Sequence, residues 1–129
     1  MTDQAEKSPQ ATFIEYLRQG KLAYQFSPSD QAVIFPPKLM AGRTGLTDLE
    51  WRVSAGKGTV YATTVAAHGS GAPYNIAMIE LDEGFRMLSR VETIAPEHVA
   101  IGMRVELRVE IGSNADMPVP VFHPMEIAA

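Results

Sequence analysis

From residue 51 onward, apolar and polar side chains alternate with a period of two, which is the pattern of half-buried β-strands. The alternation is strictest over 104–111, where one face carries Val105, Leu107, Val109 and Ile111. The other predicted strands cover 51–65, 75–81, 85–91 and 119–122. We expect 51–65 to be one long first strand with a bulge or bend at Gly56 and Gly58, because small barrels close at such positions.

The turns between these strands specify the fold further. Gly84 suits a short hairpin loop over 82–84. Residues 96–99 form a predicted helical turn between the third and fourth strands. Five strands with a helical turn after the third predict a mainly β protein, a five-stranded Greek-key OB-fold barrel. The usual ligand face of that barrel lies on strands two and three, here flanked by the loops 67–74 and 112–118.

A helix is predicted ahead of the strands. Ser8 is a suitable N-cap, Pro9 fits the first helical position, and Gly20 fits the C-terminal stop after about residue 19. An apolar stripe consists of Phe13, Ile14 and Leu17. We expect this stripe to pack on the rest of the chain, and docking on a partner protein is the alternative.

The segment 22–51 has the frame of a zinc ribbon without its cysteines. Ser27 and Asp30 have the spacing of one metal knuckle, and Ala41 and Thr44 have the spacing of a second. A structural zinc site needs four sulfur, nitrogen or oxygen ligands, which these residues do not supply. We therefore predict a metal-free segment held by apolar packing among nine side chains: Phe26, Val33, Ile34, Phe35, Leu39, Met40, Leu46, Leu49 and Trp51. A plain long loop over 27–50 is the alternative.

This frame and the motifs after it resemble the acyl-CoA-associated OB-fold family, in which a helical N-terminus and a rubredoxin-like zinc ribbon precede a small β-barrel. The motifs are Gly56-x-Gly58-Thr59-Val60-Tyr61, Tyr74-x-x-Ala77-x-Ile79-x-Leu81-Asp82-Glu83-Gly84, Ile101-Gly102-Met103-x-Val105 and Val121-Phe122-x-Pro124. The family usually has Cys-x-x-Cys-Gly at both knuckles, and here all four ligand positions are replaced. The resemblance divides the chain into an N-terminal tail and helix (1–20), a degenerate zinc ribbon (21–50) and the barrel (51–129).

The resemblance implies a non-catalytic accessory protein of acyl-CoA metabolism. Its expected partner is a thiolase-like or enoyl-CoA hydratase-like enzyme, which it would stabilise or whose acyl-CoA site it would help to shape. A free-standing protein that binds an acyl or CoA group is the alternative. A nucleic-acid-binding OB-fold is a weaker one, because strands two and three offer only Tyr74 and Phe85 for stacking. The sequence leaves open whether the chain forms a homo-oligomer.

The residue composition argues against catalysis. The chain has no cysteine, and its three histidines, at 68, 98 and 123, lack the spacing of a metal site. The carboxylates Glu80, Asp82 and Glu83 are expected to be solvated at a hairpin tip. We expect no cofactor and no metal site.

A few side chains are candidates for ligand or partner contacts: Arg43, Arg52, Lys57, His68 and Tyr74. The three basic ones would lie near the junction of ribbon and barrel, where a CoA phosphate could rest. A net charge of −4 with scattered basic residues disfavours nucleic acid. No apolar run is long enough to span a membrane, and the polar N-terminus is not a secretory signal. A cytoplasmic location is expected.

Overall fold

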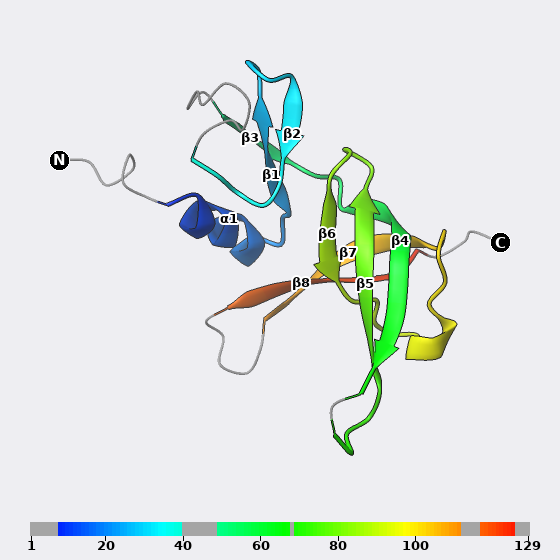
Figure 1. Cartoon of the computed structure of the whole chain (residues 1–129). Coiled ribbons are helices and arrows are strands. Elements are labelled where there is room, and N and C mark those ends of the chain that lie inside the picture. The colour runs from blue at the N-terminus through cyan, green and yellow to red at the C-terminus, as the bar shows by residue number, and fades with distance from the viewer. Residues whose placement is uncertain (1–7, 40–48, 68, 112–116, 126–129) are drawn as a thin grey trace.

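The computed structural model describes residues 8–39, 49–67, 69–111 and 117–125, and these residues form two β-sheets and one α-helix (Figure 1). In chain order the elements are α1 (Pro9–Arg18), β1 (Ala23–Ser27), β2 (Ala32–Ile34), β3 (Glu50–Val53), β4 (Lys57–Ala66), β5 (Tyr74–Leu81), β6 (Arg86–Ser89), the 3-10 helix η2 (Pro96–His98), β7 (Arg104–Ile111) and β8 (Pro118–Pro124). The protein is mainly β, as the alternation predicts.

The larger sheet is the predicted OB-fold. Its five strands lie in the order β6-β5-β4-β7-β8, and all neighbouring pairs are antiparallel. The sheet curls into a half-barrel. A single parallel bridge between Val91, just after β6, and Phe122 of β8 links its two edges. The helical turn η2 lies between β6 and β7, as predicted. A side chain at Gly58 would place its Cβ 2.6 Å from the carbonyl oxygen of Glu80, so glycine permits the close approach of β4 and β5 there.

The N-terminal helix has the predicted caps. The Ser8 Oγ accepts a hydrogen bond from the Ala11 N–H at 3.0 Å, and Gly20 adopts a φ of 80° just after the helix. Phe13 and Leu17 are buried, and Ile14 packs against the same core. The stripe therefore packs on its own chain.

The segment between helix and barrel is a second sheet rather than a plain loop. Its order is β2-β1-β3, with both pairs antiparallel. The prediction that 51–55 begins the first barrel strand is wrong, because β3 pairs with β1 through Trp51 and Arg52. The first barrel strand begins at Lys57. Whether the chain divides into domains at residue 50 stays a prediction.

The crossing from one sheet to the other is fixed by Glu83. Its carboxylate accepts hydrogen bonds from the Ser54 Oγ at 2.7 Å and from the Ala55 N–H at 2.8 Å. The Ser54 Oγ in turn accepts the Gly56 N–H at 2.9 Å, and Gly56 has a φ of 78°. The predicted bend at the glycines is therefore the point where the chain leaves one sheet for the other.

One aromatic cluster joins helix, ribbon sheet and barrel. Phe35 stacks on Phe85 with ring centroids 4.8 Å apart, and the edge of Phe13 meets Phe35 at 5.6 Å. Tyr24 of β1 lies 5.1 Å from the same Phe85 ring. The helix, the ribbon sheet and the barrel therefore share a single core, which continues into the barrel through buried residues such as Ile79.

Side-chain hydrogen bonds hold the first knuckle turn and the crossing segment of the ribbon. The buried Ser27 Oγ accepts the Asp30 N–H at 3.0 Å, which closes the turn at the first knuckle position. Gln25 binds the backbone of Lys38 twice, donating from Nε2 to its carbonyl at 2.8 Å and accepting its N–H at 2.7 Å. Together these bonds fix the first knuckle turn and the crossing segment to β1.

The predicted apolar set of the ribbon contributes unequally. Val33, Phe35 and Trp51 pack against the core, whereas Leu39 is 70% exposed, so its predicted packing role is wrong. Some predicted members of the frame lie outside the described residues: Met40, Ala41, Thr44 and Leu46.

Replacing Phe35 by alanine should lower the free energy of unfolding by about 3 kcal/mol, because the half-buried ring loses two aromatic neighbours. Denaturant unfolding measures this change. Leu39→Ala, an exposed truncation in the same segment, should cost less than about 0.5 kcal/mol. Equal and small losses in both variants would show that the ring does not tie the ribbon sheet to the barrel.

Candidate functional site

A groove of about 370 Å³ lies on the barrel between the start of β5, the end of β6 and the first half of β8. It is lined mainly by apolar atoms from nine residues: Tyr74, Asn75, Ile76, Leu88, Ser89, Arg90, Val119, Pro120 and Val121. Three large apolar side chains of the lining remain substantially exposed, namely Tyr74, Leu88 and Val119. The groove therefore offers an apolar surface on strands two and three of the OB-fold, the face that the fold uses for ligands.

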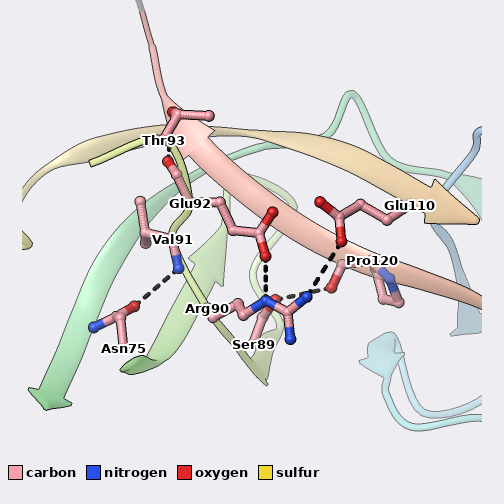
Figure 2. A network of polar contacts seen from close by, with 8 residues as sticks. All are labelled: Asn75, Ser89, Arg90, Val91, Glu92, Thr93, Glu110 and Pro120. Carbon is pink, nitrogen blue, oxygen red and sulfur yellow. Dashed lines mark hydrogen bonds and ion pairs between the residues drawn. The ribbon is translucent and has the colours of Figure 1, made fainter. Parts of the chain in front are cut away.

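A buried amide fixes the β5 side of the groove. Asn75 is 4% exposed, and its Nδ2 donates to the Thr63 Oγ1 at 2.7 Å and to the Thr64 carbonyl at 3.2 Å. Its Oδ1 accepts the Val91 N–H at 2.9 Å (Figure 2). Thr63 and Thr64 belong to β4, and Val91 bridges to β8. Asn75 of β5 is therefore linked to both of these strands.

The seam between β6 and β8 forms the other side. The Ser89 Oγ donates to the Pro120 carbonyl at 2.9 Å (Figure 2). The Phe122 N–H donates to the Arg90 carbonyl at 3.0 Å, and the Glu92 N–H donates to the Phe122 carbonyl at 2.7 Å. The groove is therefore held on a hydrogen-bonded frame.

Arg90 organises a charge cluster beside the groove. Its guanidinium pairs with Glu92 and, at 3.2 Å, with Glu110 of β7 (Figure 2). A hydrogen bond shared between the two carboxyls lowers the pKa of Glu92 and raises that of Glu110, and Arg90 also lowers the pKa of Glu92. Asn75, Ser89 and Arg90 thus all have partners within the chain. The arrangement suits an apolar ligand or protein surface better than a charged one.

Of the predicted site residues, the three in the described ranges, Arg52, Lys57 and Tyr74, do not come together at one site. Tyr74 lines the groove, but Lys57 lies at the opposite end of the β4–β5 ladder, about 25–30 Å away along the strands. Arg52 lies on β3, where its guanidinium covers the Phe26 ring at 4.0 Å and pairs with Glu50 at 3.1 Å.

Arg43 and His68 lie outside the described residues. A ligand contact at any of the five predicted positions stays a prediction.

The hairpin carboxylates Glu80 and Asp82 remain solvent-exposed, as expected from sequence, and each also has a partner within the chain. Asp82 binds the Arg104 guanidinium through both oxygens at 2.8 and 2.9 Å, and this contact lowers the pKa of Asp82. Glu80 lies 3.5 Å from Arg86, and Glu83 holds the crossing between the sheets. All three carboxylates therefore have structural contacts.

Sequence reasoning missed most of the groove. In the sequence, Leu88 cannot be distinguished from any other apolar residue of an alternating strand. Asn75 gave the one available signal, since a polar residue at the start of an apolar strand needs a partner when it is buried. Phe85, one of the two aromatic side chains that strands two and three offer for stacking, is 5% exposed and belongs to the core.

The described ranges carry neither a candidate metal site nor a candidate membrane span. There, no group of three histidine or acidic side chains could hold a metal ion. Nor is any helix in those ranges long and apolar enough to span a membrane.

Residues 51–110 match the family model described as ChsH2, C-terminal OB-fold domain. The chain is 30% identical, over 95% of its length, to 43% of a probable enoyl-CoA hydratase alpha subunit of Thermomonospora curvata. It is 42% identical, over 46% of its length, to 46% of a DUF35 domain-containing scaffold protein of Methanocaldococcus jannaschii. The chain therefore spans less than half the length of these curated relatives.

Two solved structures match over most of their own length as well. A chain of the Ltp2-ChsH2(DUF35) aldolase is similar over 90% of this chain and 94% of its own length, with a TM-score of 0.80 and 31% identity. A DUF35 family protein of unknown function from Sulfolobus solfataricus has a TM-score of 0.65, covering 95% of this chain and 90% of its own, at 13% identity. The second likeness shows the fold alone.

Replacing Asn75 by alanine should lower the free energy of unfolding by about 2 kcal/mol, because the buried Val91 N–H loses its acceptor. Ser89→Ala removes a single bond from a half-buried hydroxyl and should cost less than about 1 kcal/mol. Denaturant unfolding gives both values, and amide hydrogen exchange should be faster at Val91 only in N75A. Unchanged exchange at Val91 would contradict the assigned contact.

Proposed function

This chain belongs to the DUF35 family of acyl-CoA-associated OB-fold proteins, and we propose that it is a non-catalytic accessory subunit of a larger acyl-CoA enzyme. The observation that carries this proposal is the match of nearly the whole chain to a chain of the Ltp2-ChsH2(DUF35) aldolase. A relative named as a scaffold protein supports the accessory role.

The described side chains also favour an accessory role. Catalysis of acyl transfer or hydration needs a nucleophile or base that lies within hydrogen-bond reach of the substrate and is not already bonded within the protein. In the groove, Asn75, Ser89 and Arg90 are already bonded within the chain. The groove is therefore better suited to packing against another molecule than to catalysis.

The proposed partner is a hydratase-like or thiolase-like enzyme that acts on an acyl-CoA. The hydratase-like class is supported by two relatives named as hydratase alpha subunits. The second of these is the 3-oxo-4,17-pregnadiene-20-carboxyl-CoA hydratase alpha subunit of Mycobacterium tuberculosis, 35% identical over 60% of this chain and 26% of that protein. The thiolase-like class rests on the resemblance in sequence. A cytoplasmic location is part of the proposal.

A second candidate function is free-standing binding of an acyl group, and the apolar groove beside Tyr74 is the observation that favours it. The two functions differ in what the isolated chain does. An acyl-binding protein would hold a fatty acyl ligand by itself, whereas an accessory subunit would act only in a complex.

The purified chain should show no hydratase, aldolase or thiolase turnover of acyl-CoA substrates. Mixed with hydratase-like and thiolase-like subunits from the native host, each purified separately, it should co-elute with one of them in size-exclusion chromatography. That enzyme's melting temperature or activity should rise on addition of the chain. Turnover by the chain alone, or the absence of a complex with every candidate, would contradict the proposal.

A further inference from the structure

We infer that the accessory subunit contacts its enzyme through the groove face, defined as the outward side chains Tyr74, Ile76, Leu88 and Val119, and that the complementary enzyme surface is apolar and uncharged. This inference rests on the proposed function and adds to it the surface that is used and the chemistry of the surface it fits.

The groove face is apolar where a solvent-exposed sheet face would ordinarily be polar. On β5, burial alternates so that Asn75 and Ala77 face inward and Tyr74 and Ile76 face outward. Leu88 of β6 is 66% exposed, Tyr74 42% and Val119 41%. Three substantially exposed apolar side chains around one groove mark a surface for interaction rather than scattered exposure.

The two arginines beside the groove face, Arg86 and Arg90, have partners within the chain. The Arg86 guanidinium lies 3.7 Å from the centre of the Tyr61 ring and 3.5 Å from the Glu80 carboxylate. Arg90 pairs with both Glu92 and Glu110. An anionic ligand would have to displace these pairs, so the face is poorly suited to phosphates or nucleic acid.

An apolar protein surface fits the face at little cost in polar desolvation. Burying a polar group is expensive when it lacks a hydrogen-bond partner. Here the polar residues of the groove keep their partners when they are covered, since Asn75 binds Val91 and Ser89 binds Pro120. The same bonds hold the groove in shape, which limits the ordering cost of association.

The proposed function makes the occupant an enzyme subunit, and the pairing of the nearby cations argues against an acyl-CoA molecule. Coenzyme A carries several phosphate charges, and the cation nearest the groove, Arg90, is already paired with two carboxylates. A bare acyl chain and a second copy of this chain share the apolar chemistry, and the experiment below distinguishes both of them from the enzyme.

The test compares Leu88→Glu with Ile101→Glu. Both residues are aliphatic and strongly exposed, at 66% and 71%, and Ile101 lies in the turn before β7, outside the groove lining. A charge placed in an apolar interface lacks a partner and weakens binding strongly, whereas a charge at an exposed site elsewhere does not. Equal melting temperatures of the two variants would show that both are folded, and Leu88→Ala provides a milder variant if L88E is not.

Binding is measured by calorimetry with the enzyme subunit identified by co-elution. L88E should raise the Kd at least about tenfold and L88A about threefold, while I101E should stay within about twofold of the wild type. Wild-type binding by both Leu88 variants would overturn the inference and leave the proposed function intact. If no candidate enzyme binds the wild-type chain, the proposed function itself fails.

Two further measurements test the other occupants. Light scattering shows whether the chain alone is a dimer that L88E dissociates, and a fluorescent fatty acid shows whether the groove binds an acyl chain. We expect the L88E variant to have the same state of association as the wild type. We also expect any fatty-acid binding to be the same in both. A Leu88-dependent dimer, or Leu88-dependent fatty-acid binding, together with unaffected enzyme binding would overturn it.

Discussion

The stack of Phe35 on Phe85 is the contact on which the rest of the structure depends. One ring comes from the ribbon segment and the other from the turn that starts β6. Phe13 adds the helix to the same cluster, and Tyr24 adds β1. Small sheets of three short strands are rarely stable alone, so the ribbon sheet needs this shared core. In a zinc ribbon the metal supplies much of that stability.

The same cluster positions the candidate groove. Phe85 anchors the start of β6, and β6 leads within a few residues to Leu88, Ser89 and Arg90. The Asn75–Val91 bond and the Val91–Phe122 bridge then fix its far end to β5 and β8. A rigid frame below an apolar surface is what an accessory subunit needs to bind another protein without large rearrangement.

Local signals in the sequence were enough to predict the helix, the barrel and most turns. Ser8 caps the helix through its side chain, and Gly20 and Gly84 adopt positive φ angles, so these signals depend on a few neighbouring residues. The alternation over 104–111 reflects a face on which Val105, Leu107 and Val109 pack into the core. The strand β3 was assigned to the wrong sheet because its partner, β1, is distant in sequence and both sheets share the same period. Only the resemblance to a known family indicated that 27–50 was structured.

The candidate site was far less predictable. Its polar frame depends on contacts between distant residues, such as Ser89 with Pro120 and Asn75 with Val91, which leave no mark in either local sequence. The predicted site residues were chosen for their charge or aromatic character. Among those that the structure describes, only Tyr74 lines the groove, and the long β4–β5 ladder separates it from Lys57.

The central claim is that packing and side-chain hydrogen bonds have taken over the role of the metal in the ribbon segment. The most direct test is the zinc content of the purified chain, measured together with its melting temperature with and without a strong chelator. The account predicts no stoichiometric zinc and an unchanged melting temperature. About one zinc per chain, with a marked loss of stability in chelator, would contradict it.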